Sequence, residues 1–217
     1  MCLGAGINQT DGKASVYTTM NQCNSAGSVQ FSVGGKTAGL KETKTVSNPD
    51  WVLHGKIGYF NIDPTSTIEL ACDTSLFSAN INHGVNPKDK TYAYIVRPGT
   101  QSAGDATKYF KNIPVVVLSN TNAVQAVKHK ALNITEILFY QAGTLKIADG
   151  KTITVDAPCA VIWKENTGTI TLANPNCESN NPSIIHVSVS DKDKTTNMSF
   201  EMPIGVYSGR SVSKFLK

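Results

Sequence analysis

The sequence lacks long apolar runs and runs of like charge. No stretch approaches the roughly 18 apolar residues that a transmembrane helix needs, so such a helix is excluded and no membrane partner is expected. The net charge is +4, but the lysines stand singly among Thr, Asn and Gly. Scattered charge of this kind gives no basis for a nucleic-acid partner. The mildly positive charge is compatible with an acidic polysaccharide as a partner, and an ordinary solvated surface explains this charge equally well.

Cysteines are few and irregularly spaced. Their odd number rules out a fully paired disulfide framework, and without a C-x-x-C pair they imply no zinc site. In a strand-rich sequence a cysteine is more often a small buried apolar residue, so these residues do not indicate a cellular compartment. The five are Cys2, Cys23, Cys72, Cys159 and Cys177.

The N-terminal segment lacks the basic region and long apolar stretch of a signal peptide. Met1 is followed at once by the apolar segment CLGAGI, which resembles a strand. A chain that opens on a strand is expected to come from the middle of a longer protein.

Common catalytic and ligand-binding motifs are also missing. The sequence contains no G-x-S-x-G, no H-E-x-x-H and no phosphate-binding glycine loop. The spacing of Asp191, Lys192 and Asp193 superficially suggests calcium, but the Gly and distal Glu of a calcium-binding loop are absent. A solvated hairpin tip is the better interpretation. We therefore expect no metal site and no cofactor.

Turn-forming and β-forming residues are abundant. The chain has 17 Gly and 9 Pro among many Thr, Ser and Asn, a balance that favours strands over helices. In SVQFSVGG (28–35), Val29, Phe31 and Val33 alternate with polar residues, which is the period-two pattern of a half-buried strand. Similar short runs, bounded by turn signals, continue to the C-terminus. The predicted fold class is all-β, an antiparallel β-sandwich.

Turn residues also predict the organisation of the chain. Asp149-Gly150, between two alternating runs, predicts a type I′ hairpin because both central residues need positive φ. The segment 122–132 is the one helix-like candidate, but its Val and His content favours a strand. The polar, turn-rich segment 99–114 predicts a boundary, which gives two β regions at 1–108 and 109–217.

His54 and Tyr59 are the candidate proton-transfer residues, since they lie close together in WVLHGKIGYF (51–60). A catalytic pair of this kind would also need a third group to fix the imidazole tautomer, and no residue nearby in the sequence supplies one. The alternative is a β-hairpin with His54 in its turn and Tyr59 on a strand that faces a core or its rim. We favour the hairpin.

The other histidines show no catalytic pattern. His83 precedes Gly84 and an Asn-Pro pair, which places it in a predicted turn. His129 lies between two lysines, and His186 alternates with Ile184 and Ser188 in a predicted strand. We therefore expect no catalytic residue in this chain.

Five segments share their order and spacing with a known family. They include the elements TT-x-x-Q, G-x-x-GY and Y-x-Y-x-x-x-P, and they are LGAGI (3–7), VYTTMNQC (16–23), WVLHGKIGYF (51–60), INHGVNPKDKTYAYIVRPGT (81–100) and NTNAVQAVKHKAL (121–132). Together they resemble the β-sheet portion of the chondroitin AC, hyaluronate and xanthan lyases, and the chondroitin AC type most of all. The resemblance covers residues 1–135 well and the remainder mainly by strand pattern.

The resemblance implies a fragment of a larger bacterial enzyme, secreted or periplasmic. Residues 1–108 would form the end of a central β-supersandwich and residues 109–217 a smaller C-terminal β-sandwich. In this family the catalytic Asn, His, Tyr and Arg lie in an N-terminal helical toroid, which this sequence does not contain. The family cuts glycosaminoglycans by β-elimination at uronic acid. The chain alone is expected to be inactive, with an acidic polysaccharide and the missing helical domain as its partners.

Two further expectations concern sugar binding. Four lysines are candidates to line the polysaccharide cleft, although a solvated surface explains each of them: Lys41, Lys44, Lys56 and Lys88. The alternative function is a free-standing carbohydrate-binding or adhesin-like β-sandwich. That function requires an exposed aromatic platform, for which the candidates are Trp51, Tyr92, Tyr94 and Trp163.

Overall fold

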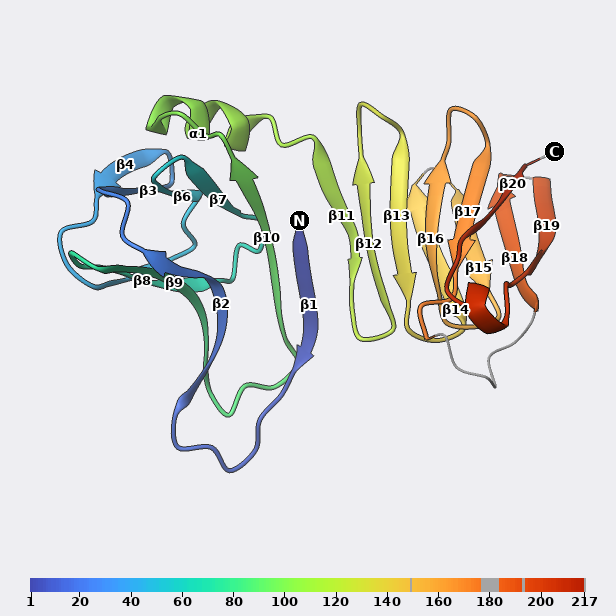
Figure 1. Ribbon diagram of the computed structural model, residues 1–217, viewed down its shortest axis with the longest axis horizontal. Coiled ribbons are helices and arrows are strands. Elements are labelled where there is room, and N and C mark those ends of the chain that lie inside the picture. Colours follow the sequence, from blue (N-terminus) through green and yellow to red (C-terminus); the bar gives the residue numbers. More distant parts are fainter. Residues whose placement is uncertain (149, 177–183, 193, 217) are drawn as a thin grey trace. The chain divides into compact units, whose positions relative to one another are not determined.

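The computed structural model describes residues 1–148, 150–176, 184–192 and 194–216 (Figure 1). The chain divides into two compact units, Met1–Ile113 (unit 1) and Pro114–Lys217 (unit 2). Each unit contains two sheets whose strands all pair antiparallel, and each has its own buried core. The predicted all-β antiparallel sandwich is confirmed. None of the helices in the described ranges has the length and apolarity needed to cross a membrane.

Unit 1 is built from ten strands. They are β1 (Cys2–Ile7), β2 (Ser15–Asn24), β3 (Val29–Val33), β4 (Lys36–Gly39), β5 (Lys44–Ser47), β6 (Trp51–His54), β7 (Ile57–Asn61), β8 (Thr67–Cys72), β9 (Leu76–Val85) and β10 (Lys90–Pro98). One sheet has the order β1-β10-β7-β6-β3-β4, and the other has the order β2-β9-β8-β5. The two sheets pack their apolar faces together around Phe31, Ile68 and Phe77.

At β6 and β7 the sheet is buried on both faces. Val52 and Tyr59 point into the core between the sheets, whereas Trp51 and Phe60 belong to a second apolar cluster that also contains Ala106. Because successive side chains of a strand point to opposite faces, alternate residues serve the two clusters. All four residues of β6 are therefore buried, which explains why its first three residues are all apolar.

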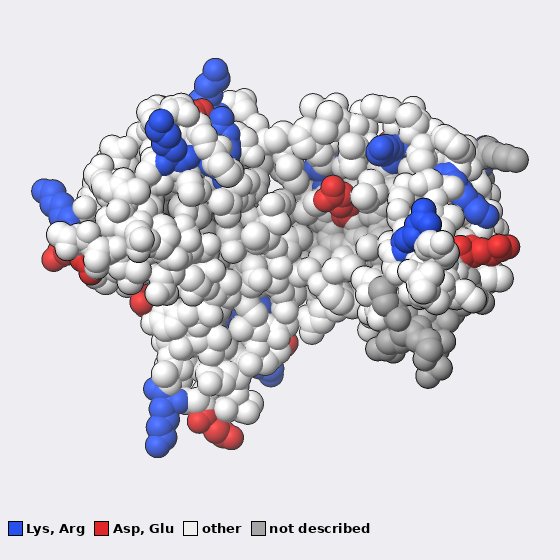
Figure 2. Space-filling model, in the orientation of Figure 1, with Lys and Arg blue, Asp and Glu red and all other residues white. Residues whose placement is uncertain are grey.

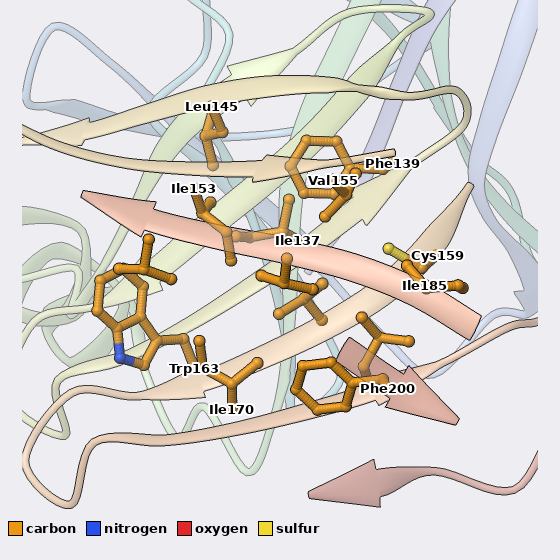
Figure 3. Packing of buried hydrophobic residues seen from close by; sticks show 14 of the residues in the cluster. Ile137, Phe139, Leu145, Ile153, Val155, Cys159, Trp163, Ile170, Ile185 and Phe200 are labelled. Carbon is orange, nitrogen blue, oxygen red and sulfur yellow. The ribbon is translucent and has the colours of Figure 1, made fainter. Parts of the chain in front are cut away.

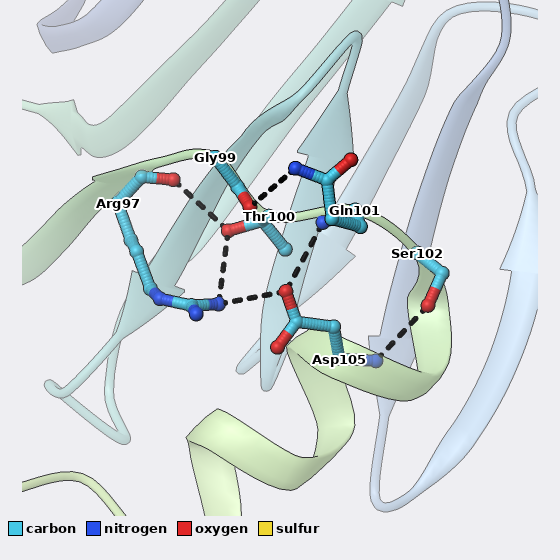
Figure 4. A network of polar contacts seen from close by, with 6 residues as sticks. All are labelled: Arg97, Gly99, Thr100, Gln101, Ser102 and Asp105. Carbon is cyan, nitrogen blue, oxygen red and sulfur yellow. Dashed lines mark hydrogen bonds and ion pairs between the residues drawn. The ribbon is translucent and has the colours of Figure 1, made fainter.

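Residues 103–111 form a helix, α1 (Ala103–Lys111), where the sequence predicts only a polar linker. The Ser102 hydroxyl accepts a hydrogen bond from the Asp105 amide at 3.2 Å, which caps the first turn. The Asp105 carboxylate accepts from the Gln101 amide at 3.0 Å and pairs with Arg97 at 2.9 Å (Figure 4). The Gln101 amide and the Arg97 guanidinium lower the pKa of Asp105. These contacts tie α1 to the end of β10.

The unit boundary follows from the position of α1. Tyr109 and Phe110 of the helix, and Ile113 beyond it, pack against the cluster that contains Trp51. The predicted division between residues 108 and 109 therefore falls inside the helix, and the structure divides after Ile113. A helix that buries its aromatic residues against unit 1 belongs to that unit.

Two glycines explain the G-x-x-GY element of the hairpin between β6 and β7. Gly55 has φ +58°, a left-handed conformation that favours glycine in the tight turn. A Cβ atom on Gly58 would lie 2.7 Å from the Phe60 ring and 2.8 Å from Thr100 Oγ1. The first glycine therefore permits the turn, and the second permits close packing beside β10.

Strand β3 departs from its predicted alternation at its end. Ser32 is 1% exposed, whereas Val33 is 37% exposed. The Ser32 hydroxyl donates to Asp50 Oδ2 at 2.7 Å, and the Gly35 amide donates to the same oxygen at 2.7 Å. A polar side chain is buried here because the Asp50 carboxylate is available to it.

The described part of unit 2 also contains ten strands. They are β11 (Val115–Asn120), β12 (Val124–His129), β13 (Ile134–Phe139), β14 (Gly143–Ala148), β15 (Lys151–Val155), β16 (Cys159–Lys164), β17 (Thr169–Ala173), β18 (Ile184–Asp191), β19 (Lys194–Glu201) and β20 (Val212–Phe215). One sheet has the order β11-β12-β13-β16-β17-β20, and the other has the order β14-β15-β18-β19. A short 3-10 turn, η1 (Gly205–Tyr207), precedes β20.

The core of unit 2 lies between these two sheets. Ile153 and Ile185 of one sheet meet Phe139 and Ile170 of the other (Figure 3). The strand predicted within residues 122–132 is confirmed as β12. In the predicted hairpin between β14 and β15, Gly150 has φ +80°, but Asp149 lies outside the described residues.

Candidate functional site

His54 and Tyr59 lie on neighbouring strands and share one aromatic neighbour. The His54 ring stacks on Phe77 with a centroid distance of 4.1 Å, and the Tyr59 ring lies 6.0 Å from the same ring. His54 is the last residue of β6 and not part of the turn, so its predicted place is wrong; the turn consists of Gly55 and Lys56. Tyr59 lies on β7 and faces the core, as predicted.

The polar atoms of this pair are occupied by residues of β2 and the loop after it. His54 Nε2 accepts a hydrogen bond from the Ala26 amide at 2.8 Å, and His54 Nδ1 lies 3.8 Å from Cys23 Sγ. The Asn21 side-chain amide donates to the Tyr59 hydroxyl and to Cys23 Sγ, the latter at 3.4 Å. Asn21 and Cys23 come from a distant part of the sequence, and no local spacing indicates them.

Burial sets the protonation of both rings. Desolvation lowers the pKa of His54, so the imidazole is neutral at neutral pH. Desolvation is also the main cause that raises the pKa of Tyr59, with the Asn21 hydrogen bond acting in the opposite direction. The two residues are 3% and 1% exposed. The arrangement suits a packed core, and the absence of a catalytic role stays a prediction.

The remaining histidines lie in separate places. His83 is in β9 and not in a turn, which corrects the prediction; it is 7% exposed, and its Nε2 lies 2.8 Å from Thr18 Oγ1. His129 ends β12 and accepts from the Leu132 amide at 3.3 Å. His186 lies in β18, as predicted, and its Nδ1 is 2.8 Å from Asp156 Oδ2.

Lowering the pH from about 7 to about 5 is expected to destabilise unit 1. Burial lowers the folded-state pKa of His54 and His83 from the ordinary value of 6.5, and Lys90 lowers that of His83 further. The unfolded chain therefore binds more protons as the pH falls through about 6.5, so stability present above that pH is lost below it. Thermal unfolding at both pH values measures the loss. His54→Gln should reduce it, and an unchanged loss in this variant would contradict the assignment.

The described residues contain no group of three or more His, Cys, Asp or Glu side chains that could hold a metal ion. Asp191 lies at the end of β18, 3.3 Å from the Lys151 ammonium, and Asp193 lies outside the described residues. The four described cysteines are free, and Cys177 also lies outside the description. Burial raises the pKa of the Cys159 thiol to about 12, so this cysteine is an unreactive part of the core.

The four candidate lysines are all exposed and lie apart along unit 1. Lys44 of β5 has its ammonium 5.7 Å from the centre of the Phe31 ring. Lys41, Lys56 and Lys88 lie in three different connections between strands. Figure 2 shows basic side chains dispersed among uncharged residues on the face drawn. A role of these lysines in binding polysaccharide stays a prediction.

The proposed aromatic platform does not form. Trp51, Tyr94 and Trp163 are buried at 1%, 7% and 3% exposure. Tyr92 is half-buried, with its ring 5.8 Å from that of Tyr94. Aromatic side chains that fill a core cannot stack on a sugar, so burial argues against the free-standing adhesin-like alternative.

Two surface pockets bring polar side chains together. The first, of about 310 Å³, lies on β15, β18 and β19 and includes the Asp156–His186 pair beside Val187 and Met198. The second, of about 300 Å³, lies where β8 and β10 begin and β9 ends. We name the second the hydroxyl pocket, because its lining includes Thr65, Ser66, Thr67 and Thr91. No motif in the sequence predicted either pocket, because residues from three different strands line each of them.

Comparison with known proteins shows that two domain models of one family match this chain, one after the other along the sequence. Residues 1–75 match the super-sandwich domain of polysaccharide lyase family 8, and residues 116–184 match the C-terminal β-sandwich domain of the same family. The two matches fall in unit 1 and unit 2, respectively. They cover most of the chain, and they give the two β regions separate domain identities.

Individual relatives agree with this result. The chain is 34% identical to chondroitinase-AC of Pedobacter heparinus over 98% of its own length and 33% of that protein. It is 30% identical to a hyaluronate lyase of Thermasporomyces composti over 79% of its own length and 24% of that protein. A solved structure of chondroitinase AC lyase from enzyme–oligosaccharide complexes superposes with a TM-score of 0.83 and 31% identity, over 98% of this chain and 34% of that one.

The chain thus spans a quarter to a third of the length of these relatives. Fold, sequence identity and the order of the domain models point to the same group of proteins, and the predicted resemblance is confirmed. The chain belongs to polysaccharide lyase family 8.

Proposed function

We propose that this chain is the non-catalytic β part of a longer bacterial lyase, secreted or periplasmic, that cleaves glycosaminoglycans at uronic acid. The observation that carries the proposal is the match of two β-domain models of one lyase family to a chain that spans a third of chondroitinase-AC. The names of the relatives, which refer to chondroitin and hyaluronate, support the class of substrate.

The chemistry of β-elimination explains why a further domain is needed. A base removes the proton at C5 of the uronic acid, the bond from C4 to its oxygen breaks, and an acid protonates that oxygen. The sugar carboxylate must also be neutralised so that the C5 proton becomes acidic enough. His54 and Tyr59 are buried and bonded within unit 1, so they offer no base to a polysaccharide. We assign these steps to a helical domain outside this chain.

The role left to the two β units is mechanical. Sandwiches with their own cores are rigid enough to support a catalytic domain and to form one side of a cleft for an anionic polymer. Lys41, Lys44, Lys56 and Lys88 are candidates for contact with that polymer. Their exposure leaves the ammonium groups accessible.

The purified chain is expected to fold and to produce no unsaturated uronate from chondroitin or hyaluronan. Absorbance of the unsaturated product measures the reaction, and chondroitinase-AC of Pedobacter heparinus under the same conditions is the positive control. Turnover by this chain alone would overturn the assignment of catalysis to another domain. A coding sequence upstream of residue 1 that specifies a helical domain with Asn, His, Tyr and Arg would support it.

A further inference from the structure

The small sheet of unit 2 gathers polar side chains that the proposed lyase reaction does not use. The pocket of about 310 Å³ on β15, β18 and β19, which we name the histidine pocket, includes Asp156, His186, Asn197 and Ser199 in its lining. His186 lies directly opposite Ser199 in the register of β18 and β19. Opposite residues of an antiparallel pair point to the same face, with Cβ atoms about 4.5–5.5 Å apart. A carboxylate, an imidazole, an amide and a hydroxyl therefore meet on one face of the sheet.

Asp156 holds His186 by two hydrogen bonds. Its Oδ1 accepts from the His186 backbone amide at 2.8 Å, and its Oδ2 lies 2.8 Å from the ring Nδ1. An ionised carboxylate only accepts hydrogen bonds, so Nδ1 carries the ring proton and Nε2 carries the lone pair. The His186 side chain is 62% exposed, and its Nε2 has no hydrogen-bond partner among the described residues. His186 thus has the tautomer-fixing group that a catalytic imidazole needs.

The charge of Asp156 suits this role. Burial acts to raise the pKa of Asp156, but the hydrogen bonds from the amide and ring of His186 outweigh burial and lower that pKa. The carboxylate is therefore ionised at neutral pH. A carboxylate at Nδ1 orients the imidazole and stabilises the imidazolium that forms when Nε2 takes up a proton. Asp156 is a positioning residue, and His186 is the candidate general base.

Ser199 and Asn197 supply the two remaining groups that acyl transfer requires. Neither side chain forms a hydrogen bond within the part of the chain that the structure describes. The cross-strand spacing brings the Ser199 hydroxyl within reach of the imidazole, and such contacts tighten when substrate binds. Asn197 lies two residues before Ser199 on the same face of β19. Its side-chain amide is a donor of the kind that stabilises an oxyanion.

We propose that the histidine pocket hydrolyses small uncharged carboxylic esters, with Ser199 as nucleophile, His186 as general base and Asn197 as oxyanion donor. The volume lies at the lower end of the range for small-molecule sites, which suits a short acyl group. Among the described lining residues none is Lys or Arg, so the pocket offers no cation to an anionic substrate. This activity is separate from the lyase reaction.

The reaction proceeds by transfer of the acyl group to serine and then to water. Ser199 Oγ attacks the ester carbonyl carbon while its proton passes to His186 Nε2. The bond from that carbon to the alcohol oxygen breaks, and Nε2 returns the proton to the leaving alcohol. Water, deprotonated by the same Nε2, then attacks the acyl-serine, which releases the carboxylic acid and restores the Ser199 hydroxyl.

Hydrolysis of p-nitrophenyl acetate by the purified chain tests the proposal. We expect saturable release of p-nitrophenolate, faster than with an equal concentration of N-acetylhistidine. Ser199→Ala and His186→Gln should each lower kcat about 100-fold, because each removes a reacting group. Asp156→Asn should lower kcat about tenfold and leave KM unchanged, because the ring is held less firmly in an intact pocket. A serine-directed fluorophosphonate should label Ser199, as peptide mass spectrometry would show.

Two variants of unit 2 are the matched controls. Ser190→Ala removes a hydroxyl of β18 that is bonded to Thr195, and His129→Gln removes an imidazole of β12. Both residues lie outside the pocket lining, so neither change should alter kcat or the labelling. Thermal unfolding establishes that each variant is folded.

No saturable turnover, an unchanged kcat in His186→Gln or Ser199→Ala, or labelling confined to other residues would each overturn the proposal. Hydrolysis lost in His186→Gln but kept in Ser199→Ala would show an imidazole acting alone, which overturns the serine mechanism as well. Release of unsaturated uronate is a separate measurement. Failure of ester hydrolysis therefore leaves the proposed function standing, and uronate release by the chain alone would overturn that function without affecting the ester assay.

Discussion

Phe77→Ala is expected to lower the free energy of unfolding of unit 1 by about 3–5 kcal/mol. Phe77 is fully buried in β9 and contacts both rings of the candidate pair, with centroid distances of 4.1 Å to His54 and 6.0 Å to Tyr59. Its truncation leaves a cavity at the centre of the core and removes the apolar surface on which the His54 ring stacks. The effect should be large because the Phe77 side chain is fully buried and all of its volume is removed from the core.

Tryptophan fluorescence during chemical denaturation measures this loss. Trp51 belongs to unit 1 and Trp163 to unit 2, so a Trp163→Phe background makes the signal report on unit 1 alone. Leu76→Ala is the matched control, since Leu76 is adjacent in β9 but 39% exposed, and it should cost under about 1 kcal/mol. A similarly small loss for Phe77→Ala would show that His54 and Tyr59 do not lie in a packed core.

Glu165→Ala is expected to destabilise unit 2 by about 2–4 kcal/mol. The Glu165 carboxylate is 12% exposed and lies 2.6 Å from the ammonium of Lys128, which is itself largely buried. It also accepts from the Thr135 hydroxyl at 3.2 Å and lies 3.8 Å from Lys151 in the opposite sheet. Removal of the carboxylate leaves one cation and one buried hydroxyl without their partner, and it breaks a link between the two sheets.

The corresponding measurement uses a Trp51→Phe background, in which Trp163 reports on unit 2. Glu136→Ala removes an equal charge from an exposed position of β13 and should change stability by no more than about 0.5 kcal/mol. A double variant with Lys128→Met should recover part of the loss, because it removes the uncompensated cation. Equal effects of the two glutamate variants would argue that the Glu165 network contributes nothing to the fold.

The regular parts of the fold were predictable because they have local signals. Val and His content indicated the strand β12, and turn glycines indicated the hairpin of β6 and β7, since both signals act over a few residues. Helix α1 was missed although Ser102 and Asp105 stand at capping spacing, because nine residues give too short a periodic pattern to outweigh the surrounding Gly and Thr. His83 was misplaced because β9 continues through Gly84, which adopts φ +83°.

The candidate sites were less predictable, because they join distant parts of the chain. Asn21 and Cys23 reach His54 and Tyr59 across separations of 31 to 38 residues. The hydroxyl pocket likewise depends on the register of β8, β9 and β10, which no short motif specifies. The family resemblance predicted the β-sandwich fold correctly. Which polar side chains are buried and which are hydrogen-bonded depends on tertiary packing, which the sequence does not specify locally.

The contacts that hold α1 have a consequence for the order of folding. Arg97, Gln101, Ser102 and Asp105 close a corner of the chain within nine residues, so the polar contacts that cap α1 are all local. Strands β2 and β9 pair residues that are much farther apart in the sequence, from Asn24 with Leu76 to Ser15 with Val85. Short loops close faster than long ones, so we expect the contacts of this corner to form before β2 and β9 pair, and the packing of α1 on the sheet to complete them.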